Sequence, residues 1–467
     1  MSAVSPPSES SAKTKPSGEI APLLKLAWPL IVNNLAVSAM SFADAVMAGR
    51  LSGRDLAAVA VGNSVWNLFF LGAMGVLLAV SPLVSQCFGA ENYNRIGAYV
   101  REALKIAAVM GIAIVAIVWF GAEPAMRLIG IEAGFRDLAI DYTRYIVWGA
   151  PAIMCFLAIR YGLEGIGHTL PILICSLLSL VVNVAGNFVF MYGYLGAPAL
   201  GGAGCGVASA IAMWFLLAAI LVYVFVDRRC QMLRVFTRHK SRIKNMKQEI
   251  LSLGIPISAN ILAEAGLFIT VSLLMGRLSA NAAAAHQIAL NYASTMFMIP
   301  MALASAITVR VGHAVGSGRP DIARQRGYVG IVICAGFMTV SAAVLLLFKD
   351  SIVSLYTTDQ AVGALAVSLL FVAAVFQISD GIQVGAAGAL RGFKDTRIPL
   401  VFNLFAYWVV GFTLAYNAAV GIDPTPRNIW IGFVFGLTVA AVLLVARYVY
   451  LTRREIAAAP VSERAAN

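Results

Sequence analysis

Residues 107–120 read AAVMGIAIVAIVWF, fourteen residues in a row without a charged side chain. A strand of a membrane β-barrel would alternate apolar and polar residues, so this unbroken run predicts a helix inside a bilayer. The whole chain of 467 residues has the same character, with 60% hydrophobic and only 12% charged residues. An ordinary soluble domain carries about 25% charged residues. The composition therefore excludes a soluble fold, a disordered chain and a soluble domain with one anchor.

Apolar segments long enough to cross a bilayer recur from one end of the chain to the other. A transmembrane helix needs roughly 20 such residues. We predict an all-α polytopic membrane protein with twelve transmembrane helices in two six-helix lobes. The predicted spans are 23–48, 57–82, 104–121, 138–160, 170–192, 203–226, 250–275, 284–309, 328–348, 361–388, 398–420 and 428–450.

The segments outside the spans differ in composition. Residues 1–22 are rich in Ser, Pro and Lys without an apolar core, which predicts a disordered tail and not a cleavable signal. The predicted order is this tail, an N-lobe at 23–227, a basic linker at 228–249, a C-lobe at 250–450 and a second tail at 451–467. The six cysteines are scattered without paired or metal-ligand spacing, so we interpret them as small packing residues.

The basic residues predict the orientation of the chain. With both termini on one side, 26 of the 34 Lys and Arg residues lie in or beside the connections on that side. Eight of them crowd into 228–247. The positive-inside rule places this side in the cytoplasm, so we expect a multi-pass protein of the bacterial inner membrane with both termini cytoplasmic. The net charge of +12 is thus a topology signal, and we expect no nucleic-acid partner.

The second half of the sequence repeats the first. Residues 49–52 (GRLS) recur unchanged at 276–279, an offset of 227. The same offset relates Pro29 to Pro256, and Gly89 to Gly316. Six spans is an even number, so both copies enter the membrane in the same direction. Two such copies are related by an axis along the membrane normal, with a cavity between them, which is an architecture of transporters.

Three carboxylates lie well inside the predicted spans: Asp44, Glu264 and Asp380. A charge at bilayer depth costs at least about 2.5–3.5 kcal/mol, so such residues are rare and usually line an ion or substrate path. Every Lys or Arg of a predicted span lies within seven residues of one of its ends, which makes permanent ion pairs deep in the membrane scarce. A carboxylate in this setting could exchange a proton, or it could hold a sodium ion with nearby oxygen atoms. The sequence leaves both open.

Helical spacing gives each acid a neighbour on the same face. The possible substrate or cation contacts are Asn33, Asn260, Phe376 and Gln383, and Glu264 and Asp380 could be Na⁺ ligands. The acids themselves break the repeat. At the offset of 227, their counterparts are Val271 for Asp44, Val37 for Glu264 and Ile153 for Asp380. A duplicated scaffold with unduplicated acids indicates that each lobe has its own role.

Several segments resemble the multidrug and toxic compound extrusion (MATE) transporters of the bacterial NorM-like branch. They are SFADAVMAG at 41–49, GNFVFMYG at 186–193, GGAGCGVASA at 201–210, GIPISANILAE at 254–264, the whole of 284–316, and QISDGIQVGAAGALRG at 377–392. The likeness runs in order from about residue 22 to residue 450.

The resemblance implies a secondary active antiporter that works by alternating access between two lobes. Such proteins export lipophilic organic cations, drugs or toxins, in exchange for Na⁺ or H⁺, and need no cofactor besides that ion. In NorM-like members the membrane acids of helices 1, 7 and 10 carry the ion-linked function, and these match Asp44, Glu264 and Asp380. A helix-5 asparagine matches Asn183, whereas a tyrosine sometimes found before the helix-10 acid is Phe376 here. We expect a monomer with membrane lipid as its surroundings.

Two other functions compete with this one. A lipid-linked oligosaccharide flippase shares the general architecture, but its anionic phosphate would call for Arg or Lys in the cavity, where this sequence offers carboxylates. An intramembrane enzyme would need a catalytic motif. The chain has no HExxH, no GxSxG and no cluster of histidines, so we do not expect an enzyme.

Overall fold

The computed structural model describes residues 16–227, 230, 245–421 and 424–458. Twelve helical segments in these residues are long and apolar enough to cross a membrane. Eleven of them contain a predicted span whole, and the fifth, Leu170–Phe190, ends two residues before the predicted 170–192, so the predicted fold class is confirmed. The helices of the first half are α1 (Pro16–Leu51), α2 (Gly53–Leu78), α3 (Val80–Gly89), α4 (Tyr93–Leu128), α5 (Ala133–Ile146), α6 (Ala150–Gly165), α7 (Leu170–Phe190) and α8 (Gly202–Val226).

The second half repeats this order with fewer breaks. Its helices are α9 (Met246–Leu278), α10 (Ala280–Gly316), α11 (Pro320–Tyr356), α12 (Gln360–Gly392), α13 (Arg397–Leu404), the π-helix η4 (Phe405–Phe412), α14 (Thr413–Val420) and α15 (Pro426–Ala458). Three spans consist of more than one helix: α2 with α3, α5 with α6, and α13 with η4 and α14. A turn at Ala79 divides the first pair, and a 3₁₀ turn at Val147–Gly149 divides the second.

The helices extend further than the predicted spans. Residues 16–22, predicted as part of a disordered tail, form the first turns of α1. Likewise, 246–249 open α9 and 451–458 complete α15, where a linker and a tail were predicted. The rest of the predicted linker and tails, apart from residue 230 and Asn245, lies outside the described residues. Hydropathy finds only the lipid-facing middle of a helix, so the polar end turns escape it.

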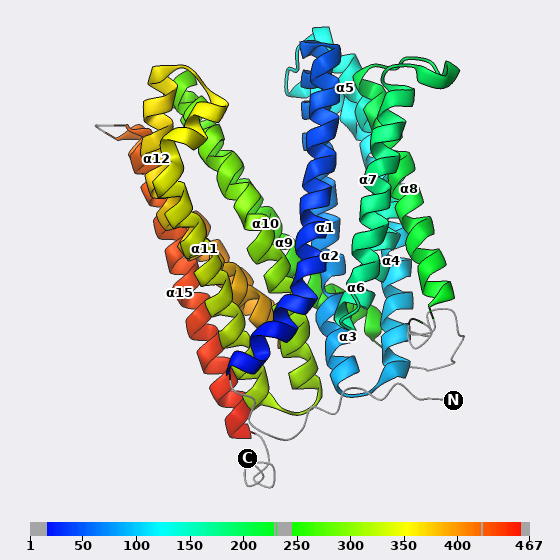
Figure 1. Ribbon diagram of the computed structural model, residues 1–467, viewed down its shortest axis with the longest axis vertical. Coiled ribbons are helices and arrows are strands. Elements are labelled where there is room, and N and C mark those ends of the chain that lie inside the picture. Colours follow the sequence, from blue (N-terminus) through cyan, green and yellow to red (C-terminus); the bar gives the residue numbers. More distant parts are fainter. Residues whose placement is uncertain (1–15, 228–229, 231–244, 422–423, 459–467) are drawn as a thin grey trace.

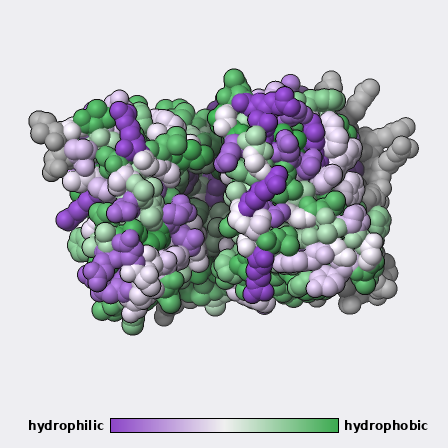
Figure 2. Space-filling model, turned by 90° about the horizontal axis from the view of Figure 1, so that it is seen from above, coloured by the Kyte–Doolittle hydropathy of each residue, from purple (hydrophilic) through white to green (hydrophobic). Residues whose placement is uncertain are grey.

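The two halves form two lobes that are joined at one end and separate at the other (Figure 1). The start of α1 and the end of α15 both lie at the joined end. There α2 packs on α9, α3 packs on α10, and α1 packs on α10. Seen from the opposite end, a hollow divides the molecule into two masses (Figure 2). Each mass has its own buried apolar core.

The joined end shows the repeat in its atomic contacts. Gln86 donates a hydrogen bond to the carbonyl of Gly392 at 2.8 Å, and His313 makes one to the carbonyl of Gly165 at 2.8 Å. Both pairs cross from lobe to lobe, and each residue of the first pair maps onto one of the second at the offset of 227. These two contacts are therefore copies of one another, related by the pseudo-two-fold axis that the sequence predicts.

The first helix of each lobe begins on the other lobe. In α1, Glu19 is buried and forms ion pairs with Arg310 of α10 and, at 3.1 Å, with Arg326 of α11. In α9, Glu249 accepts a hydrogen bond of 2.5 Å from the Tyr99 hydroxyl of α4. Tyr99 and Arg326 lie 227 residues apart, so these are again equivalent positions. We call the two contacts the α1 latch and the α9 latch.

Candidate functional site

Asp44 lies inside the N-lobe, with 8% of its side chain surface exposed. Asn187 of α7 donates a hydrogen bond of 2.6 Å to its Oδ1, and the Ser209 hydroxyl of α8 is 3.5 Å from its Oδ2. Asn183 donates a hydrogen bond of 3.2 Å to the Ser209 hydroxyl, and both Asn183 and Cys205 lie close to the carboxylate. Four polar side chains from α7 and α8 thus gather around the single acid of α1, and we call these five residues the Asp44 cluster.

The local sequence explains why these helices meet. Asn183 and Asn187 are one turn apart on α7 and so share a face. The start of α8 is rich in small residues, and a Cβ at Gly204 would lie only 2.2 Å from the carbonyl oxygen of Phe190 at the end of α7. Glycine at this position lets α8 approach α7 closely enough for Ser209 to reach Asp44.

Two oxygen atoms of the Asp44 cluster lack a hydrogen-bond donor. The side-chain oxygens of Asn183 and Asn187 are buried and have no hydrogen-bond partner in the described structure. A buried polar atom without a partner costs about 1–3 kcal/mol, and such an exception in a packed core calls for an explanation. These two oxygens are hard ligands on side chains whose amide nitrogens contact the rest of the Asp44 cluster, and each amide can turn to present its oxygen instead. A small cation or a proton would satisfy the carboxylate and these oxygens.

The C-lobe holds the other two acids. Asp380 of α12 is 4% exposed, and Glu264 of α9 is half-buried. The two carboxyl groups interact electrostatically with one another. Tyr407 is within electrostatic range of both, and its hydroxyl accepts a hydrogen bond of 2.9 Å from Gln383. We call these four residues the C-lobe acid pair and its partners.

Tyr407 reaches the acids from an unusual stretch of backbone. It lies in η4, a π-helix of eight residues within the span formed by α13 and α14. Such π-segments are rare and often occur at functional sites. The equivalent span of the N-lobe, α7, is a regular α-helix. The wider turn therefore accompanies the acid pair and is absent at the equivalent place of the other lobe.

The remaining predicted contacts lie apart from the carboxylates. Asn33 is fully buried and donates a hydrogen bond to the adjacent Asn34, about 16 Å along α1 from Asp44. Asn260 accepts a hydrogen bond of 2.7 Å from Asn403. Phe376 is 1% exposed and packs in an aromatic group with Phe268, Trp430 and Phe433. Asn33 and Phe376 are packed inside their lobes in this structure, and their role as substrate or cation contacts stays a prediction.

The structure also places charges where the sequence predicted none. Glu164 near the end of α6 is fully buried, and both of its carboxylate oxygens lack a hydrogen-bond partner. Arg160 lies 3.9 Å from it, and Arg391 of α12 interacts electrostatically with both Glu164 and Glu264. Because the helices are longer than predicted, these residues belong to spans and not to loops. No Lys, Arg or His lies within ion-pair distance of Asp44, Glu264 or Asp380 in the described ranges.

Sequence reasoning missed Asn187, Ser209, Cys205 and Tyr407. Asn187 had a readable signal, because an i, i+4 pair of asparagines on an apolar helix predicts a polar face. Ser209 and Cys205 look like ordinary small residues of a membrane helix. The position of the Tyr407 side chain depends on the register shift of a π-helix. The apolar sequence FAYWVVGF at 405–412 does not predict a π-helix.

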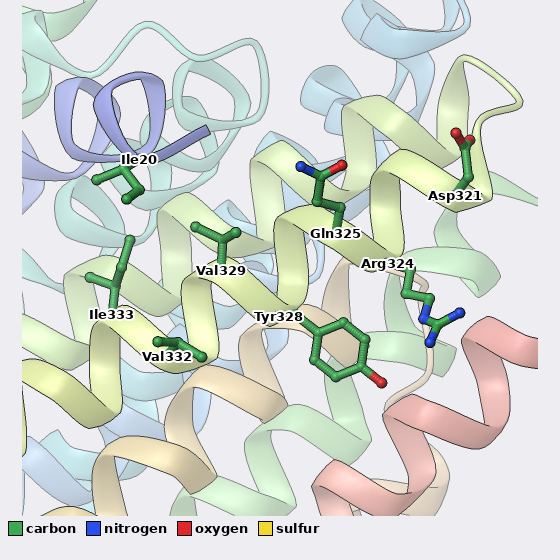
Figure 3. A pocket seen from close by; sticks show the side chains of 8 residues that line it. All are labelled: Ile20, Asp321, Arg324, Gln325, Tyr328, Val329, Val332 and Ile333. Carbon is green, nitrogen blue, oxygen red and sulfur yellow. The ribbon is translucent and has the colours of Figure 1, made fainter. Parts of the chain in front are cut away.

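A cavity of about 660 Å³ lies elsewhere, on the flank of α11 where Ile20 of α1 approaches it (Figure 3). Its lining runs from the charged Asp321 and Arg324 to the apolar Val332. None of the three predicted acids lines it. This cavity is therefore separate from the two acid sites.

Comparison with known proteins gives one consistent answer. The MatE family model matches the chain twice, at residues 29–189 and 256–417. The two matches start 227 residues apart, the same offset as the internal repeat. The multidrug resistance protein PmpM of Pseudomonas aeruginosa is 39% identical over 94% of this chain and 93% of its own length. A probable multidrug resistance protein NorM of Shewanella oneidensis is 36% identical over 93% and 95%.

Solved structures share the fold. A eukaryotic MATE transporter, AtDTX14, matches with a TM-score of 0.85 at 22% identity, covering 94% of this chain and 98% of its own. An outward-facing multidrug resistance MATE transporter matches with a TM-score of 0.85 at 20% identity over 95% and 97%. Members of this family are membrane transporters and not enzymes. With the twice-matched family model and two relatives above 35% identity, this twelve-helix chain belongs to the MatE family of multidrug transporters.

Proposed function

We propose that this protein is a secondary active antiporter that exports lipophilic organic cations in exchange for Na⁺ or H⁺. The observation that carries the proposal is the presence of buried carboxylates in each lobe without a basic partner at ion-pair distance. An isolated buried charge is unstable, so each site favours a bound cation or a proton. A lipophilic cation is the other ligand that such a site attracts.

The two acid sites differ in which ion they suit. The Asp44 cluster adds two unpaired amide oxygens to one carboxylate, and oxygen-rich sets of this kind suit a hard cation such as Na⁺. The acid pair of the C-lobe has two carboxyl groups in electrostatic contact. Two negative charges so placed repel one another, and one proton or one Na⁺ removes the repulsion. Either ion, once bound, cancels the attraction for a cationic drug.

Exchange follows if drug and ion favour different populations of the two-lobed states. A ligand shifts a conformational equilibrium only by its difference in affinity for the states. With the orientation that the basic residues predict, the joined end faces the cytoplasm and the open end faces outward. In this state an external cation has access to the space between the lobes. Its binding would release the drug, and the emptied acids would then favour drug capture from inside. We further propose that the protein lies in the inner membrane, and that it works as a monomer.

Transport by purified protein in vesicles tests this proposal. Sodium and pH gradients are imposed separately, and export of ethidium is compared with that of an anionic dye of similar size. We expect ethidium export to follow at least one gradient, and the anionic dye to be exported weakly or not at all. Equal handling of both dyes, or ethidium export that ignores both gradients, would overturn the antiporter and favour the flippase.

A further inference from the structure

A cluster of metal-binding side chains lies at the joined end of the N-lobe, away from the three acids. It consists of His168 from the loop between α6 and α7, Asp227 at the end of α8, and Cys230 just beyond it. One donor atom from each residue lies within 4.8 Å of the others. Cys230 is 1% exposed, and the other two are partly buried. We propose that these three side chains bind a borderline divalent transition metal of the Zn²⁺ class.

The backbone holds the three side chains in place. The amide of Cys230 donates a hydrogen bond of 3.0 Å to the carbonyl of Asp227, three residues earlier. An Asp-x-x-Cys pair has the spacing of the two-residue knuckles in zinc sites. Gly167, with a φ of +81°, turns the chain just before His168, and the His168 amide is held by the Leu163 carbonyl at 2.9 Å.

The distances suit a four-coordinate metal. His168 Nε2 and an Asp227 oxygen are 3.5 Å apart. With metal–ligand bonds near 2.0–2.1 Å, a tetrahedral centre places such atoms about 3.4 Å apart. The Cys230 sulfur lies within 4.8 Å of both, and a Zn–S bond near 2.3 Å would place it about 3.6 Å from them, so it needs to move inward by no more than about 1.2 Å. The Tyr223 hydroxyl or a water would be the fourth ligand.

The chemistry of the donors selects the class of metal. A set of imidazole nitrogen, thiolate sulfur and carboxylate oxygen suits Zn²⁺ or Co²⁺, whereas Mg²⁺ and Ca²⁺ prefer oxygen alone. Without metal, Tyr223 donates a hydrogen bond of 2.5 Å to Asp227, and its hydroxyl lies 2.9 Å from His168 Nε2. Because that hydroxyl has given its hydrogen to Asp227, the His168 Nε2 supplies the proton. Metal binding would move this proton to Nδ1 and release the thiol proton of Cys230 to water.

The C-lobe fills the equivalent place in another way. Asp395 is the counterpart of His168 at the offset of 227, and its amide is held by the Leu390 carbonyl at 3.1 Å, as His168 is held by Leu163. Asp395 forms an ion pair of 2.7 Å with Arg447 of α15. Both lobes thus tie this loop to their last helix, one through an ion pair and the other through the metal-ligand cluster. A metal bound in the N-lobe would hold this loop to α8 as strongly as the ion pair holds the equivalent loop to α15 in the C-lobe.

The test uses full-length protein in detergent, freed of its affinity tag and treated with a chelator before Co²⁺ is added. We expect one Co²⁺ per chain, a thiolate-to-cobalt charge-transfer band, loss of this band on adding one equivalent of Zn²⁺, and a higher midpoint of thermal unfolding with either metal. Cys230→Ser should lose the band, and His168→Gln should weaken binding at least about tenfold. The matched control Cys155→Ser should behave as the unmodified protein.

Tyr223→Phe separates the metal site from a simple hydrogen-bonded clamp. It removes the bridging hydroxyl and leaves all three ligands, so the thiolate band should remain. The proposal is overturned if the unmodified protein shows no thiolate band, or if Cys230→Ser binds Co²⁺ with the same spectrum and affinity. It is also overturned if only Tyr223→Phe alters stability, and added metal alters nothing.

Discussion

The two lobes carry the same contacts where helices touch, and different residues where charge enters the membrane. A Cβ at Gly165 would lie 2.7 Å from Val84 and 3.0 Å from the Ser81 carbonyl. The corresponding distances at Gly392, to Val311 and to the Thr308 carbonyl, are also 2.7 Å and 3.0 Å. The acids have no such counterparts, because their equivalents are Val271, Val37 and Ile153. Duplication has preserved the packing, whereas the ion chemistry differs in each lobe.

This difference matters for an exchanger that moves two lobes about one axis. Matching contacts at the joined end let both halves open and close as equivalent bodies. Each lobe then has one ion site whose affinity depends on the conformational state. Each lobe therefore has its own preference for drug or ion. Symmetric packing and asymmetric chemistry are thus two separable properties, and each can be altered without the other.

The largest expected effect comes from removing the acids. Asp380→Asn and Glu264→Gln should each reduce gradient-driven efflux in vesicles to the background of empty vesicles, with the protein still folded. Asp44→Asn should do the same through the other lobe. The reason is that a neutral amide cannot alternate between a bound ion and an attracted drug. Wild-type rates in the first two variants would contradict the assignment of the coupling residues.

Moving an acid to the equivalent position of the other lobe tests whether the two lobes are interchangeable. In an Asp44→Val background, Val271→Asp restores the count of membrane acids but places the charge in the C-lobe, where no asparagine pair surrounds it. We expect no recovery of efflux. Recovery would show that the lobes are interchangeable and that the Asp44 cluster has no special role. Protein level and thermal unfolding of the double variant provide the control for folding.

How much of this could be predicted is clearest from particular residues. The twelve spans and the repeat were predictable because each rests on a strong local signal, an apolar run or an unchanged offset. The acids were found because a carboxylate in an apolar segment is conspicuous. Asn187 and Ser209 were not, since polar residues of small size are common in membrane helices, and only the packing of α7 on α8 brings them to Asp44.

The ends of the helices were the weakest part of the sequence prediction. Glu164 and Arg391 lie within helices that were predicted to end before them, so neither the burial of Glu164 nor its electrostatic interaction with the partly buried Arg391 of the other lobe was foreseen. These two residues are also 227 apart, and one lobe carries an acid where the other carries a base. A hydropathy profile assigns both residues to loops. A charged residue in the end turn of a helix lowers the profile equally whether it contacts water or another lobe.

The next effect in size concerns the latches at the joined end. Glu19→Gln removes the carboxylate that Arg310 and Arg326 share, and breaking such a buried pair costs about 3 kcal/mol. Glu249→Gln should cost less, because the Tyr99 hydroxyl can still donate to an amide oxygen and the ion pair of Glu249 with Lys394, at 3.5 Å, is partly exposed to solvent. Thermal unfolding in detergent measures both. A spectroscopic distance between the lobes at this end should also lengthen more in the α1 variant. Equal losses would mean that the ion pair adds nothing to the α1 latch.

A smaller loss of stability, equal in both lobes, is expected when the equivalent glycines Gly165 and Gly392 are replaced by alanine. In Gly165→Ala and Gly392→Ala, the added methyl group meets a valine and a carbonyl oxygen at the same distances, and overpacking of this kind costs about 1–3 kcal/mol. The control is Gly336→Ala on α11, where nothing lies within 4 Å of the new Cβ. Losses that differ between the two lobes by more than the experimental error would break the symmetry of packing.

The smallest effect concerns the two serines that cap equivalent helices. Ser52 accepts a hydrogen bond of 3.0 Å from the Asp55 amide at the start of α2, and Ser279 accepts one of 3.0 Å from the Ala282 amide at the start of α10. Losing such a cap costs about 1 kcal/mol. Ser52 also donates to the Asp55 carboxylate at 2.5 Å, and this bond to a charged group is worth about 1.5 kcal/mol more. Ser52→Ala should therefore destabilise more than Ser279→Ala.

A double-mutant cycle can isolate the additional loss of stability expected for Ser52→Ala. Asp55 also holds the amide of Gly202 at 2.6 Å, so its carboxylate joins the start of α2 to the start of α8, a link for which Ala282 offers no side chain in the C-lobe. In an Asp55→Ala background, Ser52→Ala loses only the cap and should cost about as much as Ser279→Ala, about 1 kcal/mol. If the excess persists without Asp55, it does not come from the carboxylate. The excess would then come from another contact of Ser52 and not from backbone strain, because the dihedral angles of the two caps agree within 3°.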